Sequence, residues 1–130
     1  MTEYVKITIL SADVLTLNSS PVDLVAAPGV NKYIVPVRAI ARIYNVTVDY
    51  DTAVDVYMQC STANKRQMEA DNILDSAVER IIAFDFQQPT SSIQTILIPN
   101  DKLVLTAAAD PTNGDGDLDI HLWYEVLTIT

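Results

Sequence analysis

Apolar and polar residues alternate with a period of two along much of this chain of 130 residues. The alternation is clearest in three segments, Glu3–Leu10, Lys32–Tyr44 and Asp117–Thr128. Successive side chains of an extended strand point to opposite faces, so this period predicts half-buried β-strands. In the last segment, one face collects the apolar positions Leu118, Ile120, Leu122, Tyr124 and Val126.

Turn signals divide the chain into short segments. Asn18-Ser19-Ser20-Pro21, Ala27-Pro28-Gly29 and Pro99-Asn100-Asp101 combine residues that favour turns. The expected strands, about eight in all, are Glu3–Leu10, Val22–Val25, Lys32–Tyr44, Ala53–Cys60, Val78–Phe86, Ser92–Ile98, Leu103–Ala109 and Asp117–Thr128. Short strands at this spacing predict an all-β fold, an antiparallel β-sandwich of jelly-roll type, as a single domain over residues 1–130. A closed barrel is the alternative, whereas an α/β fold would need crossover helices between the strands.

The longest expected strand, Lys32–Tyr44, contains Pro36, which has no backbone N–H to donate to a neighbouring strand. Proline at this position predicts a β-bulge or a sheet edge. Strict alternation places one apolar face on Tyr33, Val35, Val37, Ala39, Ala41 and Ile43.

One segment breaks the strand pattern. The residues from Lys65 to Ala70 are good helix formers, and Asn72 is a suitable N-cap for a short helix through Ala77. We therefore expect one short helical insert around residues 64–77. A loop with a single helical turn is the alternative.

The charge balance limits the classes of partner. The chain has 8 Lys and Arg residues against 17 Asp and Glu, a net charge of −9, and a pI of about 4.2. Phosphate backbones would repel such an acidic protein, so we expect no direct binding of nucleic acid. One cysteine and one histidine leave little for a zinc site or a His-centred catalytic array. We find neither a run of roughly 20 apolar residues nor a signal peptide, and therefore expect no membrane association.

The hydrophobic content is high for so small a domain. Hydrophobic residues make up 49% of the chain and charged residues 19%, with a mean hydropathy of +0.19. Average domains are about 25% charged, and a small domain should be more polar because it has more surface per volume. We therefore expect part of the surface to be buried against other chains. A dense β core is the alternative explanation.

The segment Asp110–Asp119 is the most suggestive polar cluster. Asn113, Asp115 and Asp117 alternate with two glycines, as oxygen ligands do in calcium-binding loops. The match is partial, because Pro111 stands where another oxygen ligand belongs. The other interpretation is a hairpin turn built on Asn-Gly and Asp-Gly. Calcium is thus the only cofactor that the sequence brings into consideration.

The final strand carries the remaining candidate residues. His121 and Asp119 share a face, but residues two apart on a strand are ordinary neighbours, and the chain lacks a Gly-x-Ser-x-Gly motif. We therefore expect no catalytic residues and no enzymatic activity. Trp123, the only tryptophan, is placed opposite the apolar face, and tryptophan is enriched at interfaces. Trp123 and its neighbour Tyr124 are the candidate interface or ligand residues, unless this strand buries both of its faces.

Three motifs follow one another in a characteristic order. Leu15–Val37, which reads LTLNSSPVDLVAAPGVNKYIVPV, contains a Leu-Asn-small-Pro turn, a short strand, an Ala-Pro-Gly turn, a lysine and a long apolar strand. Tyr50 and Asp51 precede the strand Ala53–Met58, and Leu103–Leu127 joins an apolar strand, a Gly-Asp turn and a closing strand. In this order the chain resembles small virion structural proteins of tailed bacteriophages.

The resemblance implies a protein built into the particle: a capsid decoration or auxiliary protein, a head-fibre protein, or a tail or connector adaptor. It implies no catalytic residues. We therefore expect a noncatalytic virion structural protein, made in the host bacterial cytoplasm, that forms a homo-oligomer, for example a trimer, and docks on other virion proteins such as the major capsid protein. The alternative is a glycan- or receptor-binding β-sandwich module whose ligand site lies at Trp123 and Tyr124 or in the loop Asp110–Asp119.

Overall fold

The computed structural model describes residues 1–51, 54–63, 66–86 and 97–129. Its regular structure is strand, apart from one short helix, α1 (Ser11–Val14). The strands are β1 (Glu3–Ile9), β2 (Val22–Val25), β3 (Lys32–Tyr44), β4 (Val56–Cys60), β5 (Met68–Ala70), β6 (Arg80–Ala83), β7 (Asp85–Phe86), β8 (Leu103–Ala107) and β9 (Asp117–Thr128). No helix within these ranges has the length and hydropathy needed to span a membrane.

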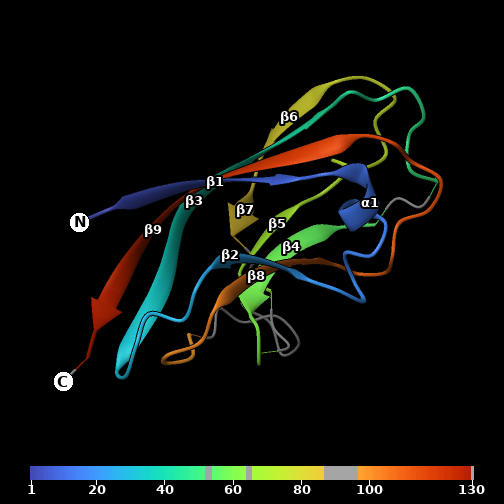
Figure 1. The fold of residues 1–130 in the computed structure, drawn as a ribbon. Coiled ribbons are helices and arrows are strands. Elements are labelled where there is room, and N and C mark those ends of the chain that lie inside the picture. Colours follow the sequence, from blue (N-terminus) through green and yellow to red (C-terminus); the bar gives the residue numbers. More distant parts are fainter. Residues whose placement is uncertain (52–53, 64–65, 87–96, 130) are drawn as a thin grey trace.

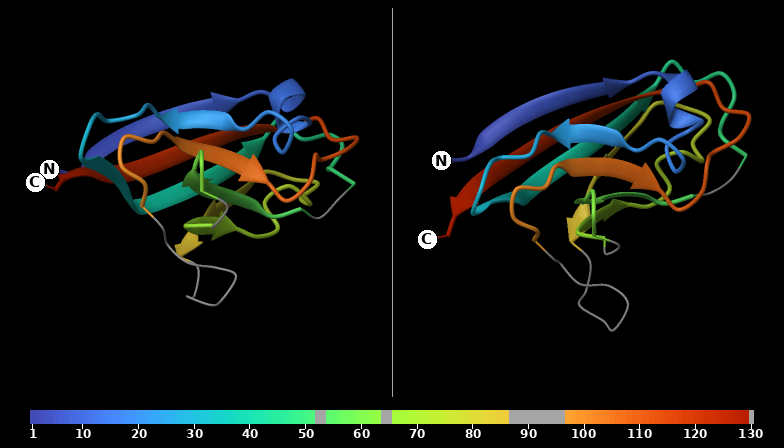
Figure 2. Two further views of the ribbon diagram at one scale, coloured as in Figure 1. Left: turned by 90° about the horizontal axis from the view of Figure 1, so that it is seen from below. Right: turned by 60° about the horizontal axis from the view of Figure 1, so that its bottom comes forward.

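Two antiparallel sheets pack against each other (Figures 1 and 2). Sheet A has the strand order β1-β9-β3-β6, and sheet B has the order β2-β8-β4-β5-β7. Four antiparallel pairs are nested along the chain: β1–β9, β2–β8, β3–β6 and β4–β5. Each pair joins strands that lie closer to the middle of the chain than those of the pair before it. Successive pairs belong to alternate sheets. This winding is that of a jelly roll. The predicted antiparallel β-sandwich of jelly-roll type is therefore confirmed.

The predicted helix around residues 64–77 is wrong in its position. Met68–Ala70 forms strand β5, which pairs antiparallel with β4, and residues 71–77 form turns and bends. Residues 64 and 65 lie outside the described part of the chain, as do residues 92–96 of the expected strand Ser92–Ile98. Met68 and Ala70 are buried, and their packing against sheet B outweighs the helix propensity of the segment. The short helix of the described residues is α1, between β1 and β2.

Pro36 lies at a β-bulge, one of the two outcomes that its missing N–H predicted. The register of β3 against β9 shifts between Pro36 and Arg38. A shift of one residue exchanges the two faces of a strand, so Ile34 is buried before the bulge and Ala39 is buried after it. The single apolar face expected from strict alternation is therefore wrong. The positions that leave the core as a result are Tyr33, Val35 and Val37.

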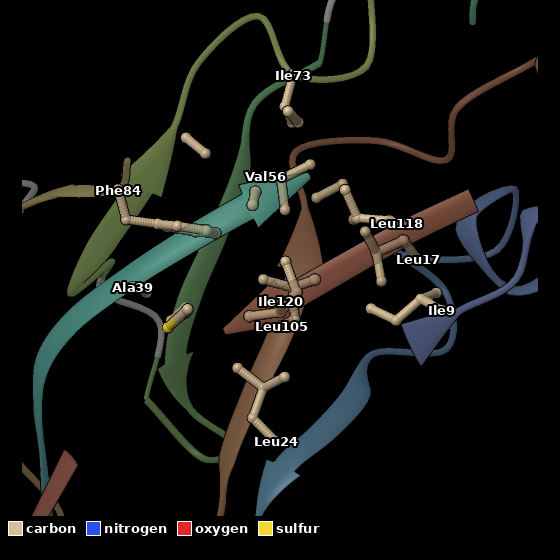
Figure 3. Packing of buried hydrophobic residues seen from close by; sticks show 14 of the residues in the cluster. Ile9, Leu17, Leu24, Ala39, Val56, Ile73, Phe84, Leu105, Leu118 and Ile120 are labelled. Atoms are coloured by element: carbon tan, nitrogen blue, oxygen red, sulfur yellow. The ribbon is translucent and has the colours of Figure 1, made fainter. Parts of the chain in front are cut away.

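The hydrophobic core fills the space between the two sheets, and Figure 3 shows part of it. Ile120 and Leu118 of sheet A meet Leu105 and Val56 of sheet B in this layer. Burying each such aliphatic side chain contributes roughly 1.5–3 kcal/mol. A dense β core thus accounts for much of the hydrophobic content of the chain, but several large apolar side chains of sheet A stay outside it.

Candidate functional site

A row of aromatic and basic side chains lies on the outer face of sheet A, which is turned away from sheet B. The strand register places Tyr4 of β1 and Arg38 of β3 on either side of Trp123 of β9. The ring centroids of Tyr4 and Trp123 are 5.0 Å apart, and the Arg38 guanidinium lies 4.8 Å from the Trp123 centroid. The Tyr4 hydroxyl and the Nδ1 atom of His121 are 2.6 Å apart. We call these four residues the aromatic row.

The aromatic row carries the positive charge of Arg38, although the protein as a whole is acidic. Arg38 takes part in none of the ion pairs found among the described residues, and its contact with Trp123 is a cation–π interaction, which stabilises by about 0.5–1 kcal/mol at an exposed site. The row therefore offers aromatic surface together with a cation that a ligand carboxylate could reach.

The two interface residues predicted from sequence point to opposite faces. Trp123 belongs to the aromatic row, whereas Tyr124 lies on the inner face and packs against the core. Burial, followed by a hydrogen bond with Glu3, raises the pKa of Tyr124. A single ligand therefore does not reach Trp123 and Tyr124 from one side. Alternation along β9 predicts this separation of faces. The partners of Trp123 are not predicted by a local pattern, because they belong to strands distant in sequence.

Asp119 is a buried carboxylate beneath the same outer face, with only 2% of the residue exposed. Its Oδ1 atom accepts hydrogen bonds from the hydroxyls of Thr8 at 2.8 Å and Tyr44 at 3.1 Å, and the Nζ atom of Lys6 lies 3.6 Å from Oδ2. Burial, and then the hydrogen bond with Asp119, raises the pKa of Tyr44. Through these contacts Asp119 of β9 connects this strand with β1 and β3. His121, its neighbour on the same face, is bonded to Tyr4 rather than to Asp119.

The loop between β8 and β9 is not the hairpin that its Asn-Gly and Asp-Gly pairs indicated. The jelly-roll winding puts β8 in sheet B and β9 in sheet A, so the loop crosses from one sheet to the other. Its glycines allow close packing on Tyr50. A Cβ atom added at Gly114 would lie 2.2 Å from the Tyr50 ring, and the Tyr50 hydroxyl donates a hydrogen bond of 2.7 Å to the carbonyl of Gly116.

The three predicted calcium ligands of this loop bond different segments of the chain. Asp115 accepts hydrogen bonds from the backbone N–H groups of Thr47–Val48 at 2.9 and 3.0 Å. A bond from the Thr47 hydroxyl and these backbone bonds lower the pKa of Asp115. Asp117 accepts a bond of 3.0 Å from the backbone of Ser11, and the Asn113 amide donates to Asp51. Calcium binding stays a prediction, and isothermal titration with calcium tests it.

An acidic cluster of Asp55, Glu69 and Asp71 was not recognised from the sequence. Their carboxylate oxygens lie within 4.8 Å of one another. Burial, and then the neighbouring carboxyls of Asp55 and Asp71, raise the pKa of Glu69 to about 7. Arg66 lies 2.7 Å from Glu69 and 3.5 Å from Asp55 and neutralises part of the charge. The pairing of β4 with β5 brings these three carboxylates together. The expectation of a helix in place of β5 did not predict this proximity.

The C-terminal end of β9 carries exposed apolar side chains. Val126, Leu127 and Ile129 are 39%, 46% and 50% exposed. A pocket of about 380 Å³ lies beside them, lined by Met1, Val35, Glu125, Val126 and Leu127. Figure 1 shows this end of β9 next to β3 and diverging from the start of β1. We call residues Glu125–Ile129 the β9 tip.

No protein-family model matches the chain, and neither a curated protein nor a solved structure matches it. Its function therefore has to be inferred from its sequence and from the surfaces described above.

Proposed function

We propose that this protein is a noncatalytic structural component of a tailed-phage virion, which self-associates and docks on the capsid or on other particle proteins. The observation that carries the proposal is the apolar surface that sheet A leaves exposed. Exposed apolar side chains that gather at one place commonly mark interaction sites, and Val126, Leu127 and Ile129 gather at the β9 tip. The exposed side chains concerned are Tyr4, Val37, Ile81, Val126, Leu127 and Ile129.

Two further features support this role. Jelly-roll sandwiches recur among viral capsid domains and lectins, although a fold alone does not determine a function. The order of motifs along Leu15–Val37 and Leu103–Leu127 resembles that of small virion proteins of tailed phages. In such a particle, repeated attachment to a symmetric lattice makes individually modest contacts effective, while a net charge of −9 disfavours nonspecific association.

The presence of the chain in particles is tested by immunolabelling. Antibodies raised against the recombinant chain should label intact, purified particles of the phage that encodes it, at regular positions in electron micrographs. Serum collected before immunisation is the control. Purified particles that contain no copy of the chain by mass spectrometry would contradict the proposal.

A glycan-binding role is the second candidate function, and the aromatic row is the observation that favours it. Aromatic rings with an adjacent cation suit the apolar face and the acidic groups of sugars. On a glycan array, Trp123→Ala should abolish saturable binding, whereas Tyr124→Phe, on the opposite face of β9, should preserve it. A wild-type protein that gives no saturable signal, or Trp123→Ala binding that equals the wild type, counts against this role.

A further inference from the structure

The β9 tip has an open edge, because β9 extends beyond its partner β1. The last residue of β9 paired with β1 is Tyr124, opposite Glu3. On its other side, β9 stays paired with β3 as far as Thr128, opposite Lys32. No strand among the described residues therefore pairs with Glu125–Thr128 on the β1 side, although Met1 and Thr2, which precede β1, contact the carboxylate of Glu125.

The direction of the backbone groups at this edge follows from the ladder with β3. The N–H of Ile129 donates to the carbonyl of Asn31 at 2.9 Å. In an antiparallel ladder, alternate residues direct their N–H and C=O groups to opposite sides. Leu127 and Ile129 therefore bond toward β3, while Val126 and Thr128 direct their backbone groups to the open side. A row of unpaired backbone groups of this kind is a template for another strand.

The side chains of the β9 tip do not protect this edge. Natural edge strands carry charged residues, proline or a bulge that prevent pairing with other chains, but after Glu125 the sequence is Val-Leu-Thr-Ile. Its β-branched and aliphatic residues favour extended structure, and its apolar side chains are about half exposed. The pocket beside Val35 and Leu127 adds apolar surface to the same place.

We propose that the β9 tip pairs with the β9 tip of a second copy of this chain, in antiparallel direction, with Thr128 opposite Thr128. This inference rests on the self-association in the proposed function and names its surface. The segment is self-complementary in this register, because Leu127 of each copy lies opposite Ile129 of the other. The two Glu125 carboxylates are kept apart, and the pairing of Glu3 with Tyr124 is left intact.

The resulting interface is a two-fold contact, in which the same residues of both copies meet. It joins the two copies of sheet A into one continuous sheet and pairs the open backbone groups of Thr128 in one copy with those of Thr128 in the other. It also covers the exposed aliphatic side chains of Leu127 and Ile129, whose burial supplies the favourable free energy.

Thr128→Pro tests the interface in the full chain. Proline removes an N–H that faces the open side, so the ladder with β3 keeps its bonds. In sedimentation velocity over a range of concentrations, the wild type should dimerise, and Thr128→Pro should raise the dissociation constant by about tenfold or more. Thr128→Val, which keeps both the N–H and the β-branched shape, should dimerise like the wild type.

Cysteine cross-linking tests the register. In the proposed pairing Leu127 and Ile129 of different copies form a non-hydrogen-bonded pair, with Cα atoms about 4.5 Å apart, within the range of a disulfide. Isotope-labelled Leu127→Cys mixed with unlabelled Ile129→Cys should give the mixed cross-linked dimer on mild oxidation. Each variant alone should cross-link far less, because its own cysteines are roughly 7–8 Å apart.

The native Cys60 does not interfere with this assay, since it is buried. Ile81→Cys, exposed on β6, is the control for random collision. A wild type that dimerises while Thr128→Pro dimerises equally well overturns the inference but leaves self-association standing. A wild type that stays monomeric at all concentrations overturns both the inference and the self-association part of the proposed function, whereas the immunolabelling result is independent of either outcome.

Discussion

Asp119 and Glu69, two of the three carboxylates buried among the described residues, are stabilised in different ways. Asp119 is surrounded by the hydroxyls of Thr8 and Tyr44 and by the ammonium group of Lys6. Glu69 instead shares its site with two other acids, and only Arg66 opposes their repulsion. Burial and the neighbouring carboxyls outweigh the arginine, so the neutral form of Glu69 persists well above the ordinary pKa of a glutamate, up to about pH 7. The free energy of unfolding of the protein should therefore depend on pH through the ionisation of Glu69.

Glu69→Gln is expected to remove part of the pH dependence of stability. An acid whose pKa is raised to about 7 on folding, from an ordinary value of 4.5, contributes stability below pH 4.5 that is lost as the pH rises to 7. Between these values the wild type should lose about 1–3 kcal/mol relative to Glu69→Gln. Thermal unfolding at several pH values measures this difference. Glu125→Gln, at an exposed position, should follow the wild type, and parallel curves for the wild type and Glu69→Gln would contradict the expectation.

At the level of elements, the loop between β8 and β9 is fixed by packing rather than by turn geometry. Gly114 lies against the ring of Tyr50, and Gly116 accepts a hydrogen bond from its hydroxyl. Asp115 holds the loop on the segment Thr47–Val48. This loop therefore closes one end of the sandwich.

Gly114→Ala should destabilise the protein, because its added Cβ atom cannot lie 2.2 Å from the Tyr50 ring. Displacement of a buried aromatic ring costs roughly 2–3 kcal/mol. Tyr50→Phe, which removes only the hydroxyl and its hydrogen bond to Gly116, should cost about 1 kcal/mol. Urea unfolding of the two variants measures both free energies. A loss for Gly114→Ala no larger than that for Tyr50→Phe would show that the loop moves away from the ring freely.

At the level of the whole molecule, the excess of acidic residues opposes folding. The net charge is −9 at pH 7, so like charges repel one another over the compact surface. Basic residues are drawn into contacts with these acids, as Lys102 with Asp23 at 3.0 Å and Arg42 with Glu79 at 2.6 Å. Such exposed pairs contribute little individually, and the repulsion remains.

Added salt is therefore expected to stabilise the protein at pH 7. Raising sodium chloride from about 10 mM to about 300 mM shortens the screening length severalfold, and the melting temperature should rise by a few degrees. The same titration near the pI, about 4.2, is an internal control in which the rise should nearly disappear. A melting temperature that falls with salt at pH 7 would show that attractive ion pairs dominate instead.

The sequence by itself determined the fold class and the limits of several strands. The segments Val22–Val25, Lys32–Tyr44 and Asp117–Thr128 are strands with the predicted ends, because alternation and turn residues act locally. It also predicted a bulge or a sheet edge at Pro36, since a missing N–H disrupts a ladder whatever its neighbours are, and the bulge is the outcome found. These properties depend only on residues close together along the chain.

Only the tertiary structure decided which strands meet and what lies beside each side chain. It turned Met68–Ala70 into a strand, because burial against β4 outweighs local helix propensity. It also placed Tyr4 and Arg38 around Trp123 and left the β9 tip without a partner on one side. These outcomes follow from contacts between residues far apart in sequence, whose burial and register no local pattern specifies.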